Sequence, residues 1–203
     1  MSPPTSSTTS TVASPEGVWS VPERQEGRGG KVATAQRATI SISKDYLHFS
    51  AAHFTIFSAT ERENLHGHNF FVEADAIGEI GDDGLCFDYN AVKQLLKELC
   101  DQLDETTLLP ARSPHLDIEE SGSRVTVRFG DERLEFLPRD VTLLEVRNVT
   151  VEELAHWFLR QLRASEEFER LPIDEITLRA SSGPGQWASA EWSSRRGDPR
   201  GRP

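Results

Sequence analysis

The chain has 203 residues, of which 36% are hydrophobic and 27% are charged, and its formal net charge is −11. This length suits one core of ordinary size, so we expect a single domain with flanking segments. No apolar run approaches the roughly 18 residues that a membrane span needs, which excludes a transmembrane role. An acidic body repels a phosphate backbone, so nucleic acid is not expected as a partner.

The two ends of the chain differ from its middle. Residues 1–36 are rich in Ser, Thr, Pro and Gly, and they hold too few large apolar side chains to form a core. Residues 193–203 combine Arg, Gly and Pro. We therefore predict two disordered tails, the second of them basic, around a domain at residues 37–192.

The sequence also bears on the cellular compartment. Cys86 and Cys100 lie in apolar surroundings and are interpreted as reduced core residues. The N-terminal segment lacks the apolar stretch of a secretory signal. Both features predict a cytoplasmic protein.

In chain order, the first predicted elements are extended. Residues 38–52 and 69–76 read as two segments of a long hairpin, with a loop near residues 56–65. An amphipathic helix follows, with its start at Asp88 or Asn90.

That helix is predicted to end near Asp104, and residues 105–121 are predicted to form an irregular loop. Alternating apolar residues then predict a second hairpin around Val125–Leu137. A second helix is predicted to start at the Thr-x-x-Glu capping box of Thr150. The last two predicted strands are Asp174–Ala180 and Trp187–Trp192, and the excess of strands indicates an antiparallel α+β fold.

Three of the six histidines have the spacing of metal ligands. In His66-Gly67-His68, an extended backbone directs both imidazoles to the same face of a strand. His53 lies on the other arm of the predicted hairpin, from which it can reach the same ion. Three neutral imidazoles suit Zn²⁺ and leave a fourth position open for water or a substrate, as in catalytic sites.

A simpler interpretation is that His66 and His68 face solvent on a strand, and the H-x-H pair alone does not decide between the two. The remaining histidines are not expected to bind metal. His48 has the opposite strand parity to His53, His115 lies in a polar segment, and His156 lies beside Trp157 on the second helix.

Two segments together resemble the signature of the 6-pyruvoyl-tetrahydropterin synthase and 6-carboxytetrahydropterin synthase family. They are residues 49–53, Phe-Ser-Ala-Ala-His, and residues 65–70, Leu-His-Gly-His-Asn-Phe. The run Asn-Val-Thr-Val-Glu at residues 148–152 is similar to the family's Asn-Pro-Thr-x-Glu. The resemblance extends over residues 38–192.

The resemblance implies a tunnelling fold, in which an antiparallel four-stranded sheet carries two helices on one face, here with an inserted hairpin. It implies a homo-oligomer, commonly a hexamer, with active sites between subunits. Zn²⁺ would be held by His53, His66 and His68. The implied substrate is a pterin, 7,8-dihydroneopterin triphosphate, which loses triphosphate and either rearranges its side chain or releases acetaldehyde.

The chain departs from the family pattern at three positions. The cysteine expected shortly before His-Gly-His is missing from Thr60–Asn64, and Glu105 replaces the histidine that normally follows Asp104. The glutamate that anchors the pterin is expected near Ser181 or Ser182, where the chain has none.

Two main hypotheses follow. The chain is either a divergent zinc lyase in which a carboxylate, Glu61, Glu63 or Glu105, serves as the base, or a zinc- and pterin-binding homologue without the standard activity. A third, hydratase-like reaction at a zinc-bound hydroxide also remains open. The candidate site residues are, for catalysis, Asp104, Glu105 and Glu63, and, for substrate binding, Arg62, Thr150 and Glu152.

Overall fold

A computed structural model describes residues 35–194, so the predicted tails lie almost entirely outside the described residues. No helix in this range is long and apolar enough to cross a membrane. The strands are β1 Arg37–Ile42, β2 His48–His53, β3 His66–Glu79, β4 Thr106–Pro110, β5 Asp117–Ser121, β6 Arg124–Phe129, β7 Glu132–Phe136, β8 Val141–Leu144, β9 Glu175–Ser181 and β10 Ala188–Ser193. The helices are α1 Tyr89–Leu103, α2 Val151–Ala164 and α3 Glu166–Glu169, with a 3₁₀ turn, η1, at Pro138–Asp140.

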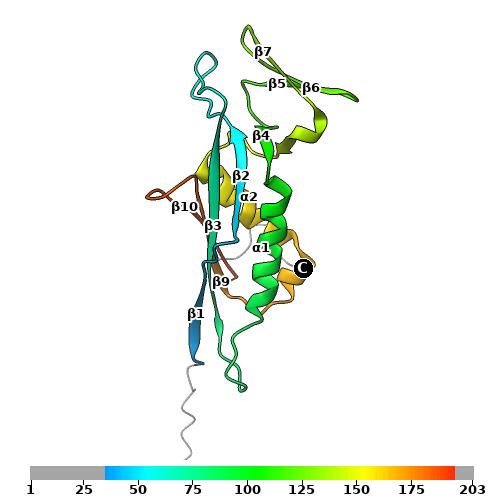
Figure 1. Ribbon diagram of the computed structural model, residues 1–203. Coiled ribbons are helices and arrows are strands. Elements are labelled where there is room, and N and C mark those ends of the chain that lie inside the picture. Colours follow the sequence, from blue (N-terminus) through cyan, green and yellow to red (C-terminus); the bar gives the residue numbers. More distant parts are fainter. Residues whose placement is uncertain (1–34, 195–203) are drawn as a thin grey trace, which may run out of the picture. The chain divides into compact units, whose positions relative to one another are not determined.

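The main sheet is built around the long strand β3. Its order is β10-β9-β3-β2-β4-β8, and β1 also pairs with β3 (Figure 1). The predicted first segment is divided into β1 and β2 by a turn in which the Leu47 N–H donates to the Lys44 carbonyl at 2.9 Å. Both strands run antiparallel to β3, and β2 pairs with its first half. The predicted long hairpin is therefore confirmed, with one arm in two pieces.

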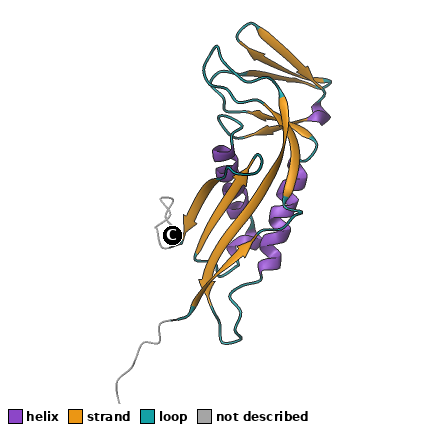
Figure 2. Cartoon of the chain, turned by 60° about the vertical axis from the view of Figure 1, so that its left-hand side comes forward, coloured by secondary structure: helices purple, strands orange, loops and turns teal. Residues whose placement is uncertain are grey.

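Two helices cover one face of this sheet (Figure 2). Along β3 the alternate residues Phe70, Val72, Ala74 and Ala76 are buried against α1 and α2, whereas their neighbours on the strand are more exposed. Asp88 caps α1 by accepting the Asn90 N–H, as predicted from the sequence. The α+β tunnelling architecture is therefore confirmed.

Both cysteines behave as predicted. Cys100 of α1 is fully buried, and this burial raises the pKa of its thiol to about 12. Cys86 is half-buried, and neither cysteine forms a disulfide. Neither lines the site described below.

The sheet is wider than the predicted four strands. The prediction of an irregular loop at residues 105–121 is wrong, because this range contains β4 and β5. β4 pairs in parallel with β2 and with β8, whereas the other pairings of the main sheet are antiparallel. β4 has no polar–apolar alternation because four consecutive residues of it are buried, so its sequence lacks the usual strand pattern.

The predicted inserted hairpin is part of a separate three-stranded sheet, β5-β6-β7. This insert has its own apolar cluster, which also contains residues of the main domain. The cluster combines Val125, Val127 and Phe129 of β6 with Leu109 of β4 and with Phe54 and Ile56 from the loop after β2.

The main core gives a first testable prediction. Leu96 on α1 is fully buried, so Leu96→Ala should lower the free energy of unfolding by about 2–5 kcal/mol through lost burial and a cavity. Leu85 is 66% exposed, and Leu85→Ala should change it by less than about 0.5 kcal/mol. Urea denaturation of both variants tests this, and equal effects would contradict the assignment of the core.

Candidate metal centre

His53, His66 and His68 come together at one end of the β2–β3 pair. The register places His53 directly opposite His66, and His68 follows two residues later on the same face. One ring nitrogen from each histidine lies within 4.8 Å of those of the other two. The ring of His53 is 4.7 Å from that of His66 and 5.3 Å from that of His68, measured between centroids.

Backbone carbonyls orient two of these rings. The Nδ1–H of His53 donates to the Val149 carbonyl at 2.9 Å, and the Nδ1–H of His66 donates to the Asn64 carbonyl at 2.8 Å. A carbonyl can only accept, so the proton of each neutral ring must be on Nδ1, and each Nε2 presents a lone pair.

The three Nε2 atoms lie close together. The Nε2 atoms of His66 and His68 are 3.0 Å apart, a distance at which the Nε2–H tautomer of His68 donates to His66. The Nε2 of His53 is buried and has no hydrogen-bond partner, so its lone pair is left unsatisfied. The three residues therefore fit a metal ion, and three imidazoles are a donor set that suits Zn²⁺.

Protonation of His53 would satisfy its Nε2, but the folded protein disfavours it. The pKa of His53 is lowered to about 4, chiefly by burial of the ring and also by the neighbouring His66 and His68. Between about pH 6.5 and pH 4, His53 is therefore protonated in the unfolded chain and neutral in the folded chain. His53 therefore disfavours the folded, metal-free protein progressively as the pH falls through this window.

The segment before α2 supports the centre. The Asn148 side chain accepts the Ile56 N–H at 3.1 Å and donates to the Ile56 carbonyl at 2.8 Å, which fixes the loop after His53. Val149 supplies the carbonyl for His53. Thr150 caps α2 by accepting a backbone N–H of its first turn at 3.4 Å. The Asn-x-Thr pattern therefore has a structural reason at each of its three positions.

A pocket of about 260 Å³ opens beside the histidines. Among the described residues, no lysine or arginine lines it. It contains the predicted site residues Glu63, Thr150 and Glu152. Its lining residues are His53, Thr55, Glu63, His66, His68, Phe70, Thr150, Val151, Glu152, Ser182 and Gln186.

Sequence reasoning did not predict Ser182 or Gln186 as lining residues. Both lie in the turn between β9 and β10, and the Gln186 amide donates to the Ser182 hydroxyl at 3.0 Å. Only the position of Ser182 could have indicated its role, because the family resemblance placed the pterin-anchoring glutamate near Ser181 or Ser182. A small polar side chain occupies that place in the pocket.

Glu63 is the carboxylate nearest to the histidines among the predicted bases. One of its oxygens accepts the Thr55 N–H at 3.0 Å and lies 4.0 Å from the Nε2 of His66. Burial opposes ionisation, but the hydrogen bonds from Thr55 and the nearby His66 and His53 outweigh it and lower the pKa of Glu63. Glu63 is therefore ionised at neutral pH.

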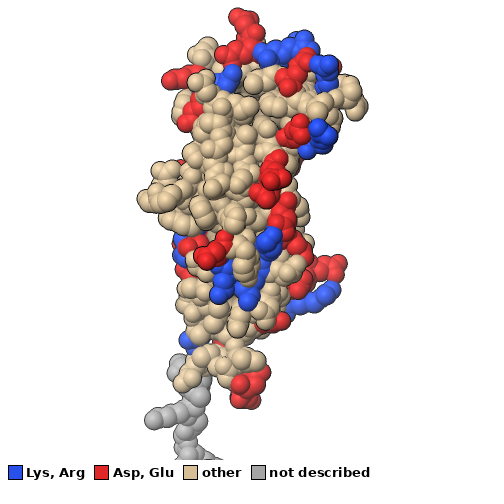
Figure 3. Space-filling model, viewed as in Figure 1, with Lys and Arg blue, Asp and Glu red and all other residues tan. Residues whose placement is uncertain are grey.

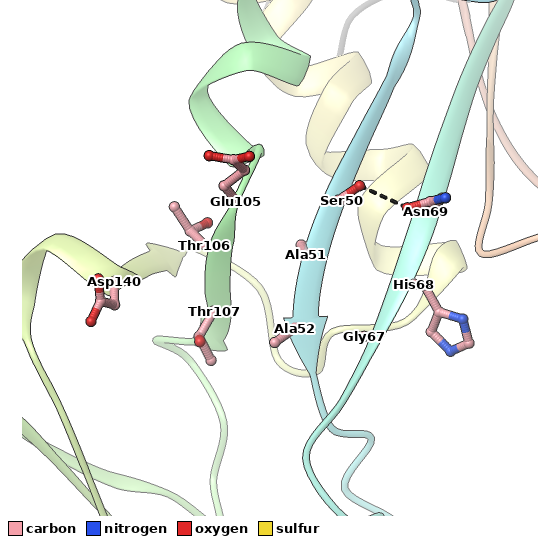
Figure 4. Close-up of a pocket in the computed structure, with 10 residues that line it drawn as sticks. All are labelled: Ser50, Ala51, Ala52, Gly67, His68, Asn69, Glu105, Thr106, Thr107 and Asp140. Carbon is pink, nitrogen blue, oxygen red and sulfur yellow. Dashed lines mark hydrogen bonds between the residues drawn. The ribbon is translucent and has the colours of Figure 1, made fainter.

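The other predicted acids lie elsewhere in the chain. The Asp104 carboxylate accepts the Ser50 N–H at 2.7 Å, and Glu105 follows with a φ of 56° where α1 turns into β4. Glu105 lines a different pocket of about 600 Å³, whose lining includes His68 but neither His53 nor His66. In Figure 4 the ring of His68 points away from Glu105 and Asp140. Within one chain, Asp104 and Glu105 do not join Glu63 at the histidines.

Arg62 is also held away from the pocket. Its Nε and Nη2 donate to the Glu132 carboxylate, the first at 2.8 Å, and its Nη1 donates to the Glu63 carbonyl at 2.8 Å. All three guanidinium nitrogens thus have acceptors within the protein. The predicted contact of Arg62 with a triphosphate is therefore not supported by its position.

The chain resembles known proteins in both sequence and structure. A sequence profile described as 6-pyruvoyl tetrahydropterin synthase matches residues 41–192. A Methanocaldococcus jannaschii protein, described as a candidate 6-carboxy-5,6,7,8-tetrahydropterin synthase, is 30% identical over 146 residues, which are 70% of this chain and 88% of the relative. A Pyrococcus horikoshii protein of the same description is 30% identical over 147 residues, 71% of this chain and 86% of the relative.

The solved structures to which this chain is similar include members of the same family. The Plasmodium vivax 6-pyruvoyltetrahydropterin synthase aligns with a TM-score of 0.72 and 28% identity over 78% of this chain and 99% of its own. The Plasmodium falciparum enzyme aligns with a TM-score of 0.71 and 29% identity, over 77% and 98%. A further Plasmodium vivax structure is of a variant in which a catalytic glutamate is replaced by alanine. The chain belongs to the 6-pyruvoyl tetrahydropterin synthase family.

Proposed function

We propose that the protein is a zinc-dependent lyase that acts on 7,8-dihydroneopterin triphosphate or a related pterin. The observation that carries this proposal is the buried, unpartnered Nε2 of His53, which faces the Nε2 atoms of two further histidines beside an ionised Glu63. A metal ion and a base at one pocket are the two requirements of the family reaction.

Each group has a separate role in this proposal. His53, His66 and His68 hold Zn²⁺, which when bound polarises the side-chain hydroxyls of the pterin and raises their acidity. The Glu63 carboxylate takes a proton from a side-chain carbon, and triphosphate leaves. Thr150, Glu152, Ser182 and Gln186 bind and orient the pterin in the remaining pocket.

Glu63 takes the place of the missing cysteine. It lies three residues before His66 in sequence, within the segment where the family cysteine is expected, and its side chain lines the pocket. The Plasmodium vivax synthase variant is described as a catalytic-residue mutant at a glutamate, so a related protein uses a carboxylate for catalysis. This supports Glu63 over Glu61, whose side chain is exposed at the tip of the loop.

One observation favours the alternative, a zinc- and pterin-binding homologue without the standard activity. A triphosphate carries several negative charges, yet no lysine or arginine of residues 35–194 lines the pocket. A neighbouring subunit would have to supply these cations. Pterin binding by the zinc-loaded protein without triphosphate release would select this alternative.

We also propose that the chain forms a homo-hexamer with sites between subunits. The outer face of β2 and of the first half of β3 carries the uncharged, solvent-accessible residues Ser50, Ala52, Gly67, Asn69 and Phe71, and the charged residues Glu73 and Asp75 follow only further along β3. Figure 3 shows few charged side chains over β2 and the upper part of β3, whereas the insert above and the region below carry many. In an oligomer, Asp104 and Glu105 could act only by lying at the pocket of a neighbouring subunit.

The metal assignment predicts a specific loss of zinc. Wild-type protein purified without chelators should carry about one Zn²⁺ per chain, as measured by inductively coupled plasma mass spectrometry, because three imidazoles form one site. His53→Asn and His66→Asn should each abolish this content. His48→Asn is the matched control, since His48 lies on the same strand as His53 but is exposed. Zinc retained in His53→Asn would contradict the site.

The assignment of Glu63 as the base predicts a defect in turnover. Glu63→Gln keeps the size of the side chain but removes the base, so kcat for triphosphate release should fall by about 10²–10⁴-fold with zinc content unchanged. Glu61→Gln should remain within about twofold of wild type, because surface charges contribute little. Wild-type turnover in Glu63→Gln would refute this role.

The assembly prediction is tested separately by light scattering coupled to size-exclusion chromatography. The expected result is a mass close to six chains, each of 22.7 kDa. A monomer at micromolar concentration would contradict both the hexamer and the placement of Asp104 and Glu105 at a shared site.

A further inference from the structure

The inserted sheet shares its apolar cluster with the loop that carries Glu63. Phe54 and Ile56, which follow the metal ligand His53, are 1% and 7% exposed, and they pack with Val127 and Phe129 of β6. The insert therefore packs directly against the loop beside the site. This loop connects His53 to His66, two of the three candidate ligands.

Arg62 links the insert to this loop by charge. Its guanidinium carbon lies 5.0 Å from the centre of the Phe54 ring and 5.8 Å from that of Phe129, so the cation stacks between the loop and β6. Glu132, at the start of β7, accepts hydrogen bonds from two of its nitrogens. The Arg62 side chain is 14% exposed, whereas that of Glu132 is 56% exposed, so the cation is shielded from solvent and its carboxylate partner is partly solvated.

The same guanidinium fixes the backbone of the next residue. Its third nitrogen, Nη1, donates to the Glu63 carbonyl at 2.8 Å. The Glu63 N–H donates to the Thr55 carbonyl at 2.9 Å, and the Glu63 carboxylate accepts the Thr55 N–H. With both sides of its backbone held, Glu63 has little freedom to turn its carboxylate away from His66.

We propose that Arg62 and Glu132 form a latch through which the inserted sheet positions Glu63 in the pocket. Arg62 and Glu132 are thus positioning residues rather than substrate contacts. This inference rests on the proposed role of Glu63 as the base. A displaced carboxylate lowers the rate without removing metal or substrate binding, because correct placement of a base contributes to kcat.

The first test measures the latch directly and needs no activity. In Glu132→Ala, hydrogen exchange at residues 55–65, followed by mass spectrometry, should become at least about tenfold faster, because the amide of Glu63 loses its protection. Glu135→Ala is the matched control. Glu135 lies on the same strand, β7, and pairs with Arg124 and Arg133 within the insert, away from the loop. Unchanged exchange in Glu132→Ala, or equal acceleration in both variants, would overturn the inference.

The second test measures what the latch does in catalysis. Glu132→Ala and Arg62→Lys should lower kcat by about tenfold with KM and zinc content within about twofold, whereas Glu135→Ala keeps wild-type kinetics. Arg62→Lys is preferred to truncation because it retains a buried cation over the two rings while losing the planar fork.

The two proposals fail in different ways. Wild-type kcat in Glu132→Ala and Arg62→Lys, in an enzyme that Glu63→Gln inactivates, would overturn the latch alone. Full activity of Glu63→Gln would refute the role of Glu63 as the base, and no triphosphate release by the zinc-loaded wild-type protein would refute the proposed lyase, whatever the exchange experiment shows.

Discussion

The candidate site depends on one constraint, the register of β2 on β3. Because His53 pairs directly with His66, three imidazoles from two strands face the same small volume. A shift of one residue would turn all side chains of β2 to the other face of the sheet, which would separate His53 from its partners. The stacked Phe49 and Phe70 rings in the adjacent core oppose such a shift, since they would lose their contact.

The electrostatics of the pocket favour a cation at the three histidines. Two backbone carbonyls hold protons on the outer nitrogens of His53 and His66, so their inner nitrogens are acceptors, and that of His53 has no donor. Burial keeps His53 neutral down to about pH 4, which leaves its lone pair available for a metal over the physiological range. The adjacent carboxylate, Glu63, adds a negative charge that favours a divalent ion further.

The inserted sheet, β5-β6-β7, packs against the loop beside the histidines. A three-stranded sheet placed between β4 and β8 would be a neutral addition if it formed its own core. Instead, it shares a core with the loop after His53 and holds Arg62 beside Glu63. The loop that carries Glu63, the proposed base, is thus stabilised by a segment remote in sequence.

The sequence by itself determined the two helices with their caps, the long hairpin, the structural cysteines and the three metal-ligand candidates, because each depends on local periodicity or on residues close along the chain. Tertiary structure alone decided the strand β4, whose parallel pairing with β2 leaves no alternating pattern in its sequence. It also decided that Glu63 reaches the histidines while Arg62 turns to the insert, since these neighbours differ only in which distant partners are available. Residues such as Ser182 and Gln186 enter the pocket because β9 and β10 bring their turn beside α2, and no local pattern encodes that contact.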